Sequence, residues 1–333
     1  MSNLHIQRKP TSPDILEKRC RNCGSTEVDI IKSGTDLHPF FSYRVYGLRS
    51  RAKVRSTRLR MGKKLRILDA FLFGFLSKLG RYCVDAECEA WNITDAMICH
   101  SCEFYCIHHL LDESMLEKMY VDYRTETYKK DWEEFEPGYI KNVGQYIGGA
   151  DEAACRLKSM DPYLREMLKE YRKPLDAFEA ILDWGGSDGI NLPRVFSKAR
   201  RYVHDISGWA PVEGVTMLNN IDGSVQFDYI QIMHVLEHVL RPIEFLEGVI
   251  ANLKPDGILY LEVPVEFSGT GLVVKALNNE RRLKVHEHIN LYTPRSLEAL
   301  ARTLDLQVLD IRTEIIDFYW CEGPCLRLLA AKR

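Results

Sequence analysis

The stretch ILDWGGSDGINLP, residues 181–193, places a glycine-rich bend directly after a short apolar segment that ends in an acid. Glycine lacks a Cβ atom, so such a bend lets a ligand approach the backbone closely. The spacing Asp183-x-Gly185-Gly186-x-x-Gly189 supplies neither the G-x-G-x-x-G of a dinucleotide loop nor the lysine of a P-loop. An acid at the end of the strand disfavours a pyrophosphate and favours a ligand with an amine or a hydroxyl group.

A second acid, Asp205, ends the next apolar segment, RYVHD. Rossmann-like sheets place a carboxylate at this point to bind ribose hydroxyls. Together, Asp183 and Asp205 predict a nucleoside ligand that carries ribose hydroxyls and a cationic tail but no phosphates. S-adenosylmethionine fits that description.

The second half of the chain alternates short apolar segments with amphipathic ones, and helical stretches are expected between the strands. Strands are expected at residues 180–184, 201–206, 214–218, 227–233, 257–263, 306–312 and 327–332. A helix is expected within residues 241–257, where Leu246, Val249, Ile250 and Leu253 form one apolar stripe. Thr293 is expected to cap a second helix at residues 293–304. This alternation predicts an α/β fold with a Rossmann-like, doubly wound sheet.

Four segments in order resemble class I S-adenosylmethionine-dependent methyltransferases: ILDWGGSDG, VHDIS, FDYIQIMHVLEHVLRPIEFLEGVIANLKPDGILYLEVP and HEHINLYTPRSLEALA. The resemblance covers roughly residues 177–333, and Ser187 stands where many members have another glycine. It implies that the glycine bend shapes the methionine side of the cofactor pocket, that Asp205 binds the ribose and that Ile206 lies against the adenine. The implied cofactor residues are Asp183, Gly185, Gly186, Ser187, Gly189, Asp205, Ile206, Asn220, Ile221, Asp222, Met233 and His234.

Seven of the ten cysteines fall between Cys20 and Cys106. In a chain without an export signal, clustered cysteines indicate metal ligands rather than disulfides. The two C-x-x-C pairs can present four thiolates to one tetrahedral Zn²⁺ ion. The expected ligands are Cys20, Cys23, Cys99 and Cys102. A second site formed by Cys83 and Cys88 with Cys106 or His100 is an alternative, and Cys321 and Cys325 are interpreted as packing residues.

The front of the chain resembles a narrower group. Its cysteine pairs, followed by LDESMLEKMYVDY, are similar to the zinc-binding front of nucleotide-sugar C-methyltransferases. This resemblance implies a sugar, nucleotide-sugar or glycan-precursor substrate. Two departures are a segment at about residues 48–95 that has no counterpart and the lack of the further C-terminal α/β domain of those enzymes.

The unmatched segment contains a basic run, RSRAKVRSTRLRMGKKLR, followed by the apolar ILDAFLFGFLSKLG. Such a pair is compatible with peripheral contact to an anionic membrane or with binding of an acidic polymer. The commoner explanation is a solvated basic face beside a helix packed on the domain, because clustered charge shows only an electrostatic possibility.

The segment VHEHINLYTP follows the fifth expected strand of the core, where class I enzymes build the acceptor site. By resemblance, His288 is the expected general base and Glu287 orients it; His286 is a rival base. His234 is expected to contact ligand, whereas Glu237 and His238 are interpreted as capping and packing residues. Tyr123 and Tyr128 could reach over the acceptor from the linker, although aromatics of a linker helix more often belong to the core.

The 333 residues contain 46% hydrophobic residues and carry a formal net charge of −2, so the chain can bury a substantial core, and nucleic acid is disfavoured as a partner. The first residues lack a signal-peptide pattern, which predicts a cytoplasmic protein. We expect an irregular cysteine-rich zinc-binding domain at residues 1–111, a helical linker broken at Gly148–Gly149 at 112–175 and the methyltransferase core at 176–333. The alternatives are O-methylation of another small hydroxylated metabolite and a nucleic-acid-binding module on a vestigial methyltransferase scaffold.

Overall fold

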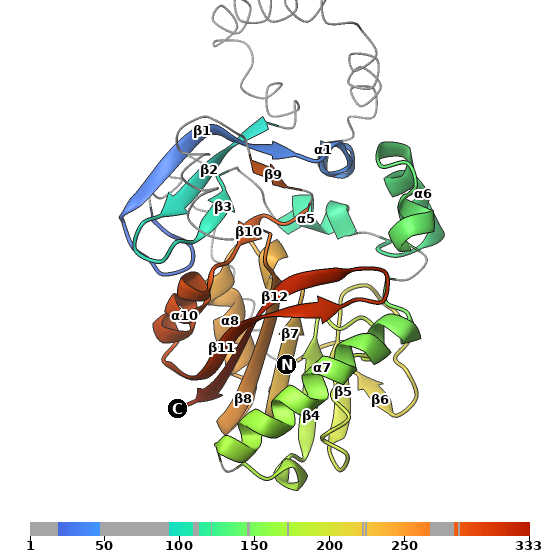
Figure 1. Ribbon diagram of the computed structural model, residues 1–333, viewed down its shortest axis with the longest axis vertical. Coiled ribbons are helices and arrows are strands. Elements are labelled where there is room, and N and C mark those ends of the chain that lie inside the picture. The colour runs from blue at the N-terminus through green and yellow to red at the C-terminus, as the bar shows by residue number, and fades with distance from the viewer. Residues whose placement is uncertain are drawn as a thin grey trace, which may run out of the picture.

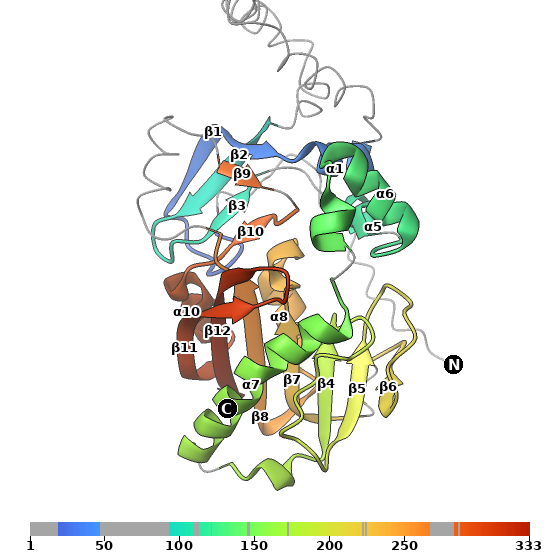
Figure 2. The same ribbon diagram turned by 45° about the vertical axis from the view of Figure 1, so that its right-hand side comes forward.

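The computed structural model describes residues 19–46, 93–108, 113–120, 122–144, 147–171, 173–221, 223, 225–266, 283–285 and 287–333. Its strands form a seven-stranded sheet and a five-stranded sheet. Figures 1 and 2 show the five-stranded sheet above the seven-stranded one, with α5 and α6 beside it. Most of the unmatched segment at residues 48–95 lies outside the described residues.

The larger sheet has the strand order β11-β12-β8-β7-β4-β5-β6. Neighbours from β8 to β6 run parallel, and β12 is antiparallel to both β8 and β11. The Rossmann-like sheet is confirmed, with mixed strand directions. Its strands are β4 (Ala180–Trp184), β5 (Arg200–His204), β6 (Val215–Met217), β7 (Phe227–Met233), β8 (Leu253–Pro264), β11 (Leu306–Asp317) and β12 (Glu322–Lys332).

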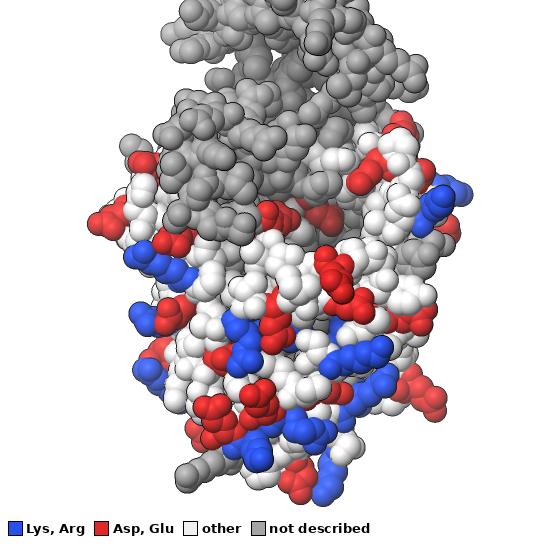
Figure 3. All heavy atoms as spheres, viewed as in Figure 1, with Lys and Arg blue, Asp and Glu red and all other residues white. Residues whose placement is uncertain are grey.

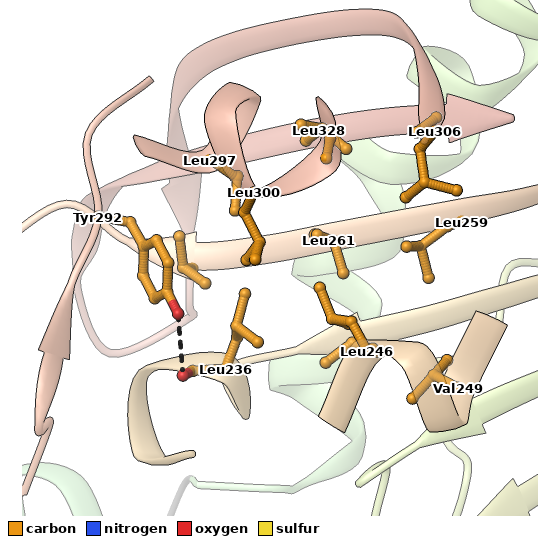
Figure 4. Packing of buried hydrophobic residues seen from close by; sticks show 14 of the residues in the cluster. Leu236, Leu246, Val249, Leu259, Leu261, Tyr292, Leu297, Leu300, Leu306 and Leu328 are labelled. Carbon is orange, nitrogen blue, oxygen red and sulfur yellow. Dashed lines mark hydrogen bonds between the residues drawn. The ribbon is translucent and has the colours of Figure 1, made fainter. Parts of the chain in front are cut away.

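Helices cover both faces of this sheet. Successive residues of a strand point to opposite sides, so apolar strand residues lie on both faces. Ile181 packs in one core cluster with α7 (Ala150–Glu170), whereas Leu182 packs in another with α8 (Pro242–Ile250) and α10 (Pro294–Thr303). Figure 4 shows this second cluster, in which leucines of α8 and α10 meet those of β8. As expected, Thr293 caps α10, and its side-chain oxygen accepts a hydrogen bond of 3.1 Å from the backbone nitrogen of Ser296.

Two local predictions differ from the structure. The connections from β4 to β5 and from β5 to β6 are turns, not helices, because glycines and prolines interrupt residues 185–214. The helix predicted within residues 241–257 ends at Ile250, and Leu253 begins β8. The apolar stripe misled here because Leu253 is fully buried in the same cluster as Leu246 and Val249, although it lies on a strand.

The smaller sheet has the strand order β10-β3-β2-β1-β9. The front end is therefore more regular than expected, since it also forms α1 (Pro39–Tyr46). Two strands from the second half of the chain pair with it, β10 antiparallel to β3 and β9 parallel to β1. The strands are β1 (Val28–Leu37), β2 (Ile93–Cys99), β3 (Tyr105–Ile107), β9 (Leu283–Val285) and β10 (Asn290–Leu291).

The region predicted as a helical linker, residues 112–175, is largely helical, and its last helix, α7, packs on the larger sheet. It contains α5 (Glu113–Tyr120), α6 (Glu126–Phe135) and a π-helical turn at Ile140–Gly144. The expected break is also confirmed, because Gly149 is the N-cap of α7. Aromatic residues of α1 and α6 pack together: the Phe40 and Trp132 rings stack with their centroids 4.1 Å apart. This packing places the linker beside the smaller sheet and over one end of the larger one.

No helix within the described residues is long and apolar enough to span a membrane. On the face shown in Figure 3, acidic and basic side chains are interspersed over the described surface. The described residues on this face form no extended patch of a single charge. The basic run that motivated the polyanion and membrane interpretations lies outside the described residues, so both remain predictions.

Candidate functional site

The glycine bend follows β4 and needs glycine for steric reasons. A Cβ atom on Gly186 would lie 2.0 Å from Cγ of Asp183, and one on Gly185 would lie 2.5 Å from Cγ2 of Val235. Gly185 also has a φ of 78°, in the left-handed region. The bend therefore presses its backbone against the acid at the strand end, as a close-approach ligand site requires.

The carboxylate of Asp205 is fixed by one hydrogen bond from the bend and one from its own loop. Its Oδ2 accepts from the backbone nitrogen of Ser187 at 2.8 Å, and its Oδ1 accepts from that of Ser207 at 2.6 Å. The next side chain, Ile206, is 82% exposed although it is apolar. An exposed isoleucine beside a fixed carboxylate suits an adenosine ligand, because one side chain can contact the base while the other binds ribose hydroxyls.

Asp183 is 1% exposed, and its Oδ2 has no hydrogen-bond partner within the described residues. Burial raises the pKa of this carboxyl, and the charges of Asp205 and Asp188 raise it further, so that it reaches about 7 despite the opposing effect of Gln231. A cation in the bend would favour the ionised form. The positively charged methionine end of a sulfonium cofactor matches this environment.

The bend opens into a cavity of about 1030 Å³. Gly189, Asn220 and Ile221 do not line it, and Asp222 lies outside the described residues. A Cβ on Gly189 would lie 2.8 Å from Cγ1 of Val215, so this glycine serves packing beneath the bend. The expected site residues that line the cavity are Asp183, Gly185, Gly186, Ser187, Asp205, Ile206, Met233, His234, Glu287 and His288.

Glu287 and His288 reach the cavity from the loop before β10. The carboxylate of Glu287 accepts a hydrogen bond of 3.4 Å from the hydroxyl of Tyr128. Nδ1 of His288 forms an ion pair with Glu266, and its Nε2 lies 4.0 Å from Oε1 of Glu237. The rival base His286 lies outside the described residues.

Burial and neighbouring charges shift the pKa values of the ionisable side chains around this loop. Burial opposes charge on His288, but the hydrogen bond to Glu266 and the charge of Glu237 outweigh it and raise the pKa to about 9. Burial lowers the pKa of His238 to about 4, although Glu237 acts in the opposite direction. Burial also raises the pKa of Glu287. At neutral pH, His288 is therefore cationic and His238 neutral.

Sequence reasoning missed several cavity residues. His238 and Tyr120 line the cavity, with the Tyr120 hydroxyl 2.5 Å from Nδ1 of His238, although His238 was expected to pack. Tyr123 also lines it, and Arg124 donates a hydrogen bond of 3.2 Å from Nη1 to Oγ of Ser187. The available signal was the polar and aromatic density of MYVDYR immediately before the core, which favours a ligand-facing linker over a purely packed one.

The four expected metal ligands come together at one point. The Sγ atoms of Cys20 and Cys102 are 3.7 Å apart, as are those of Cys23 and Cys99, and all four lie within 4.8 Å of one another. Cys106 is buried in β3 outside this group. His100 instead pairs with Asp29 at 2.8 Å. Cys83 and Cys88 lie outside the described residues, so the second site remains a prediction.

A family model described as a methyltransferase domain matches residues 157–311. This part of the chain is a methyltransferase domain. The match begins in α7 and ends within β11, so it includes the glycine bend, Asp205 and the Glu287–His288 loop. The chain therefore contains an S-adenosylmethionine-dependent methyltransferase domain, in agreement with the ligand that its two acids predict. No curated protein matches the sequence significantly.

Solved structures of methyltransferases resemble the domain at low identity. The 1,6-didemethyltoxoflavin-N1-methyltransferase of Burkholderia thailandensis, with S-adenosylhomocysteine bound, is 18% identical over 60% of this chain and 85% of its own, with a TM-score of 0.41. The magnesium protoporphyrin IX methyltransferase of Synechocystis PCC 6803, also with S-adenosylhomocysteine, is 14% identical over 67% and 100%, with a TM-score of 0.43. The acceptors named for these two methyltransferases differ, and neither is a sugar.

Proposed function

We propose that this methyltransferase transfers the methyl group of S-adenosylmethionine to a sugar, a nucleotide sugar or a glycan precursor. The observation that carries the proposal is one cavity of about 1030 Å³ that joins the cofactor bend to Glu287 and His288. Ligand pockets usually measure about 300–1000 Å³, so this cavity has room for a cofactor and an acceptor together. Its acceptor side offers carboxylate, imidazole and phenol groups, which bind a hydroxyl-rich molecule.

The cofactor would lie with its methionine end at the bend. Asp183 would face the cationic groups and Asp205 the ribose. Arg124 supplies a cation for the methionine carboxylate, because its Nε is buried without a hydrogen-bond partner within the described residues. The sulfonium methyl is already activated, so the remaining task is to align the acceptor and to remove its proton.

Within the loop, the geometry favours Glu287 as the general base. The neighbouring His288 would orient the substrate that receives the methyl group. Both ring nitrogens of His288 face carboxylates, Glu266 on one side and Glu237 on the other. The ion pair with Glu266 and the nearby charge of Glu237 favour the protonated ring, so His288 is a weaker candidate for the base than Glu287. The carboxylate of Glu287, held by the hydroxyl of Tyr128, keeps acceptor capacity on the cavity wall.

The four cysteines would hold one structural Zn²⁺ ion. Zn–S bonds of about 2.3 Å in a tetrahedron separate the sulfurs by about 3.8 Å, and two of the sulfur pairs lie 3.7 Å apart. Four thiolates leave no open position, so this ion would stabilise the smaller sheet and take no part in methyl transfer. Metal analysis of the purified protein should find zinc that is lost in Cys102→Ser.

Calorimetry followed by a methyl-transfer assay tests the proposal. S-adenosylhomocysteine should bind the folded protein, and labelled methyl should pass to a member of a panel of nucleotide sugars and glycan precursors. Glu287→Gln should lower turnover by about 10²–10⁴-fold with little change in cofactor affinity. Glu298→Gln, on the exposed side of α10, is the matched control.

Three outcomes would contradict parts of this proposal separately. Failure of the folded protein to bind the cofactor would refute the donor. Methyl transfer to other metabolites but to none of the panel would refute the substrate class. Normal turnover in Glu287→Gln, together with loss of turnover in His288→Gln, would return the role of base to His288. Loss of an α-deuterium from the acceptor during turnover would identify carbon methylation, since O-methylation does not require that exchange.

A further inference from the structure

Glu237 is a buried acid without hydrogen bonds. It lies in the short turn Leu236–His238 after β7 and is 1% exposed, and neither carboxylate oxygen has a hydrogen-bond partner within the described residues. A buried carboxylate of this kind requires a compensating charge close by. Its nearest basic neighbours are three imidazoles, those of His234, His238 and His288.

Two of these imidazoles point the same ring atom at the same oxygen. Nε2 of His238 lies 3.9 Å from Oε1 of Glu237, and Nε2 of His288 lies 4.0 Å from it. Both separations are too long for hydrogen bonds. The three ligand atoms thus surround a common point without bonding to one another.

The outward-facing nitrogen of each ring is held by an oxygen. Nδ1 of His238 is 2.5 Å from the hydroxyl of Tyr120 and 3.3 Å from the carbonyl oxygen of Glu287, and Nδ1 of His288 is paired with Glu266. Histidines that bind metals almost always engage their other nitrogen in this way, with a carboxylate, a carbonyl or another oxygen. The outer contacts fix both rings with Nε2 directed inward.

We propose that Glu237, His238 and His288 bind a divalent first-row transition-metal ion in the acceptor half of the cavity. Two imidazole nitrogens and one carboxylate form the donor set of catalytic zinc sites and of other open transition-metal sites. Bonds of about 2.0–2.2 Å would draw the ligand atoms together by roughly half an ångström from their present separations. Three protein ligands leave further positions on the ion for other molecules.

His234, Glu262 and Cys325 form a second cluster of potential metal ligands. In this cluster the carboxylate is already hydrogen-bonded. The carboxylate of Glu262 already accepts hydrogen bonds from Arg156 at 2.9 Å and Arg327 at 3.0 Å. It also accepts one of 2.7 Å from the hydroxyl of Tyr260. The lone pairs of Glu262 are committed to cations and a phenol, so we assign the metal to Glu237, whose carboxylate accepts no hydrogen bond within the described residues.

The ion would serve the acceptor and not the cofactor. His238 and His288 line the same cavity as Glu287. An oxygen of the acceptor, as hydroxyl or carbonyl, could occupy an open position on the ion, which lowers the pKa of a bound hydroxyl or polarises a carbonyl. Metal binding itself does not depend on the identity of the acceptor, so it can be measured without turnover.

Cobalt binding to the full-length protein tests this site. Metal-stripped wild-type protein, Glu237→Gln and the control Glu247→Gln, on an exposed position of α8, are dialysed against Co²⁺ under reducing conditions, and cobalt per chain is measured together with the absorption spectrum. We expect Glu237→Gln to hold one cobalt ion fewer than the wild type and than Glu247→Gln. Thiolate-to-cobalt charge-transfer bands from the cysteine site should be the same in all three.

The converse variant, Cys102→Ser, should lose the thiolate bands while keeping the ion that depends on Glu237. Unchanged cobalt content in a folded Glu237→Gln protein would overturn the proposal. So would a wild-type protein whose entire cobalt content is accounted for by the thiolate bands. Neither outcome depends on methyl transfer, so the failure of this site is distinguishable from failure of the proposed function.

Discussion

Asn22, in the first cysteine pair, donates a hydrogen bond of 2.7 Å from Nδ2 to the backbone carbonyl of Ser296, 274 residues later. Ser296 lies in the first turn of α10, and the strand before that helix, β10, pairs with β3 of the smaller sheet. The rings of Phe104 and Tyr292 meet in the same region, with centroids 5.2 Å apart. The cysteine cluster is thus tied to the element that follows the Glu287–His288 loop.

Asn22→Ala should therefore destabilise the protein without removing a metal ligand. Asn22 is fully buried, and its loss leaves the Ser296 carbonyl without this partner, which costs about 1–3 kcal/mol in the free energy of unfolding. Urea denaturation measures the change, and metal analysis checks that the cysteine site is intact. The exposed Asn219→Ala is the control and should be close to neutral. Equal stability of the two variants would show that the tie contributes nothing.

Gly186→Ala should impair cofactor binding. The new methyl would lie 2.0 Å from Cγ of Asp183, so the buried carboxylate or the bend has to move. Because both form the expected methionine site, we expect the affinity for S-adenosylhomocysteine to fall on the order of tenfold or more, equivalent to about 1.4 kcal/mol. Calorimetry at one temperature measures it.

The matched control for that substitution is Gly248→Ala on α8. A Cβ at Gly248 would meet nothing within 4 Å, and its backbone is helical. Alanine there should leave cofactor affinity unchanged and stabilise the helix by about 0.5–1 kcal/mol. If both variants bound the cofactor like the wild type, close approach at the bend would not be needed for binding.

Cofactor affinity should depend on pH through Asp183. Its pKa is raised to about 7, chiefly by burial, so the carboxyl is protonated below that pH and ionised above it. The cationic cofactor prefers the ionised form, and therefore affinity should rise as pH increases. The gain from about pH 6 to about pH 8 should be up to about tenfold, since one pKa unit corresponds to about 1.4 kcal/mol.

Calorimetry in buffers with different ionisation enthalpies should detect proton release on binding below about pH 7. Asp183→Asn should bind more weakly and lose most of the pH dependence. S-adenosylhomocysteine, which lacks the sulfonium charge, should show a smaller dependence than S-adenosylmethionine. A pH dependence that persists in Asp183→Asn would assign it to another group.

Local sequence patterns were sufficient for the centre of the fold. The expected strands 180–184 and 227–233 coincide with β4 and β7, because buried parallel strands appear in a sequence as short continuous apolar segments. Asp183, the glycines and Asp205 were recognisable for a related reason. Each of them lies at or just after the end of a strand, so residues that are close in the sequence are also close in the site.

Features that depend on distant segments were not predictable in this way. His238 was interpreted as a packing residue, yet its ring centroid lies 4.7 Å from that of His288, which belongs to a loop much later in the chain. Likewise, β9 and β10 are too short to produce a periodic pattern, and they pair with strands of the N-terminal region. Only the tertiary fold brings these residues together.

Buried charges link β12, β8 and α7. Arg327 is fully buried, and its Nε donates to Oε2 of Glu262 at 3.0 Å, while Nη1 of Arg156 donates to Oε1 at 2.9 Å. Arg327→Met removes one cation and leaves an acid that is 1% exposed with a single arginine. Breaking a buried pair on one side costs about 3–5 kcal/mol, so we expect a loss of that order in urea denaturation.

The control for Arg327→Met is Arg302→Met. Arg302 pairs with Glu298 on the surface of α10, where the two side chains are 72% and 37% exposed, and an exposed pair contributes about 0–1 kcal/mol. The difference between the two variants isolates the effect of burial. If Arg327→Met were as stable as Arg302→Met, the remaining contacts with Arg156, His234 and Tyr260 would be sufficient to hold the charge of Glu262.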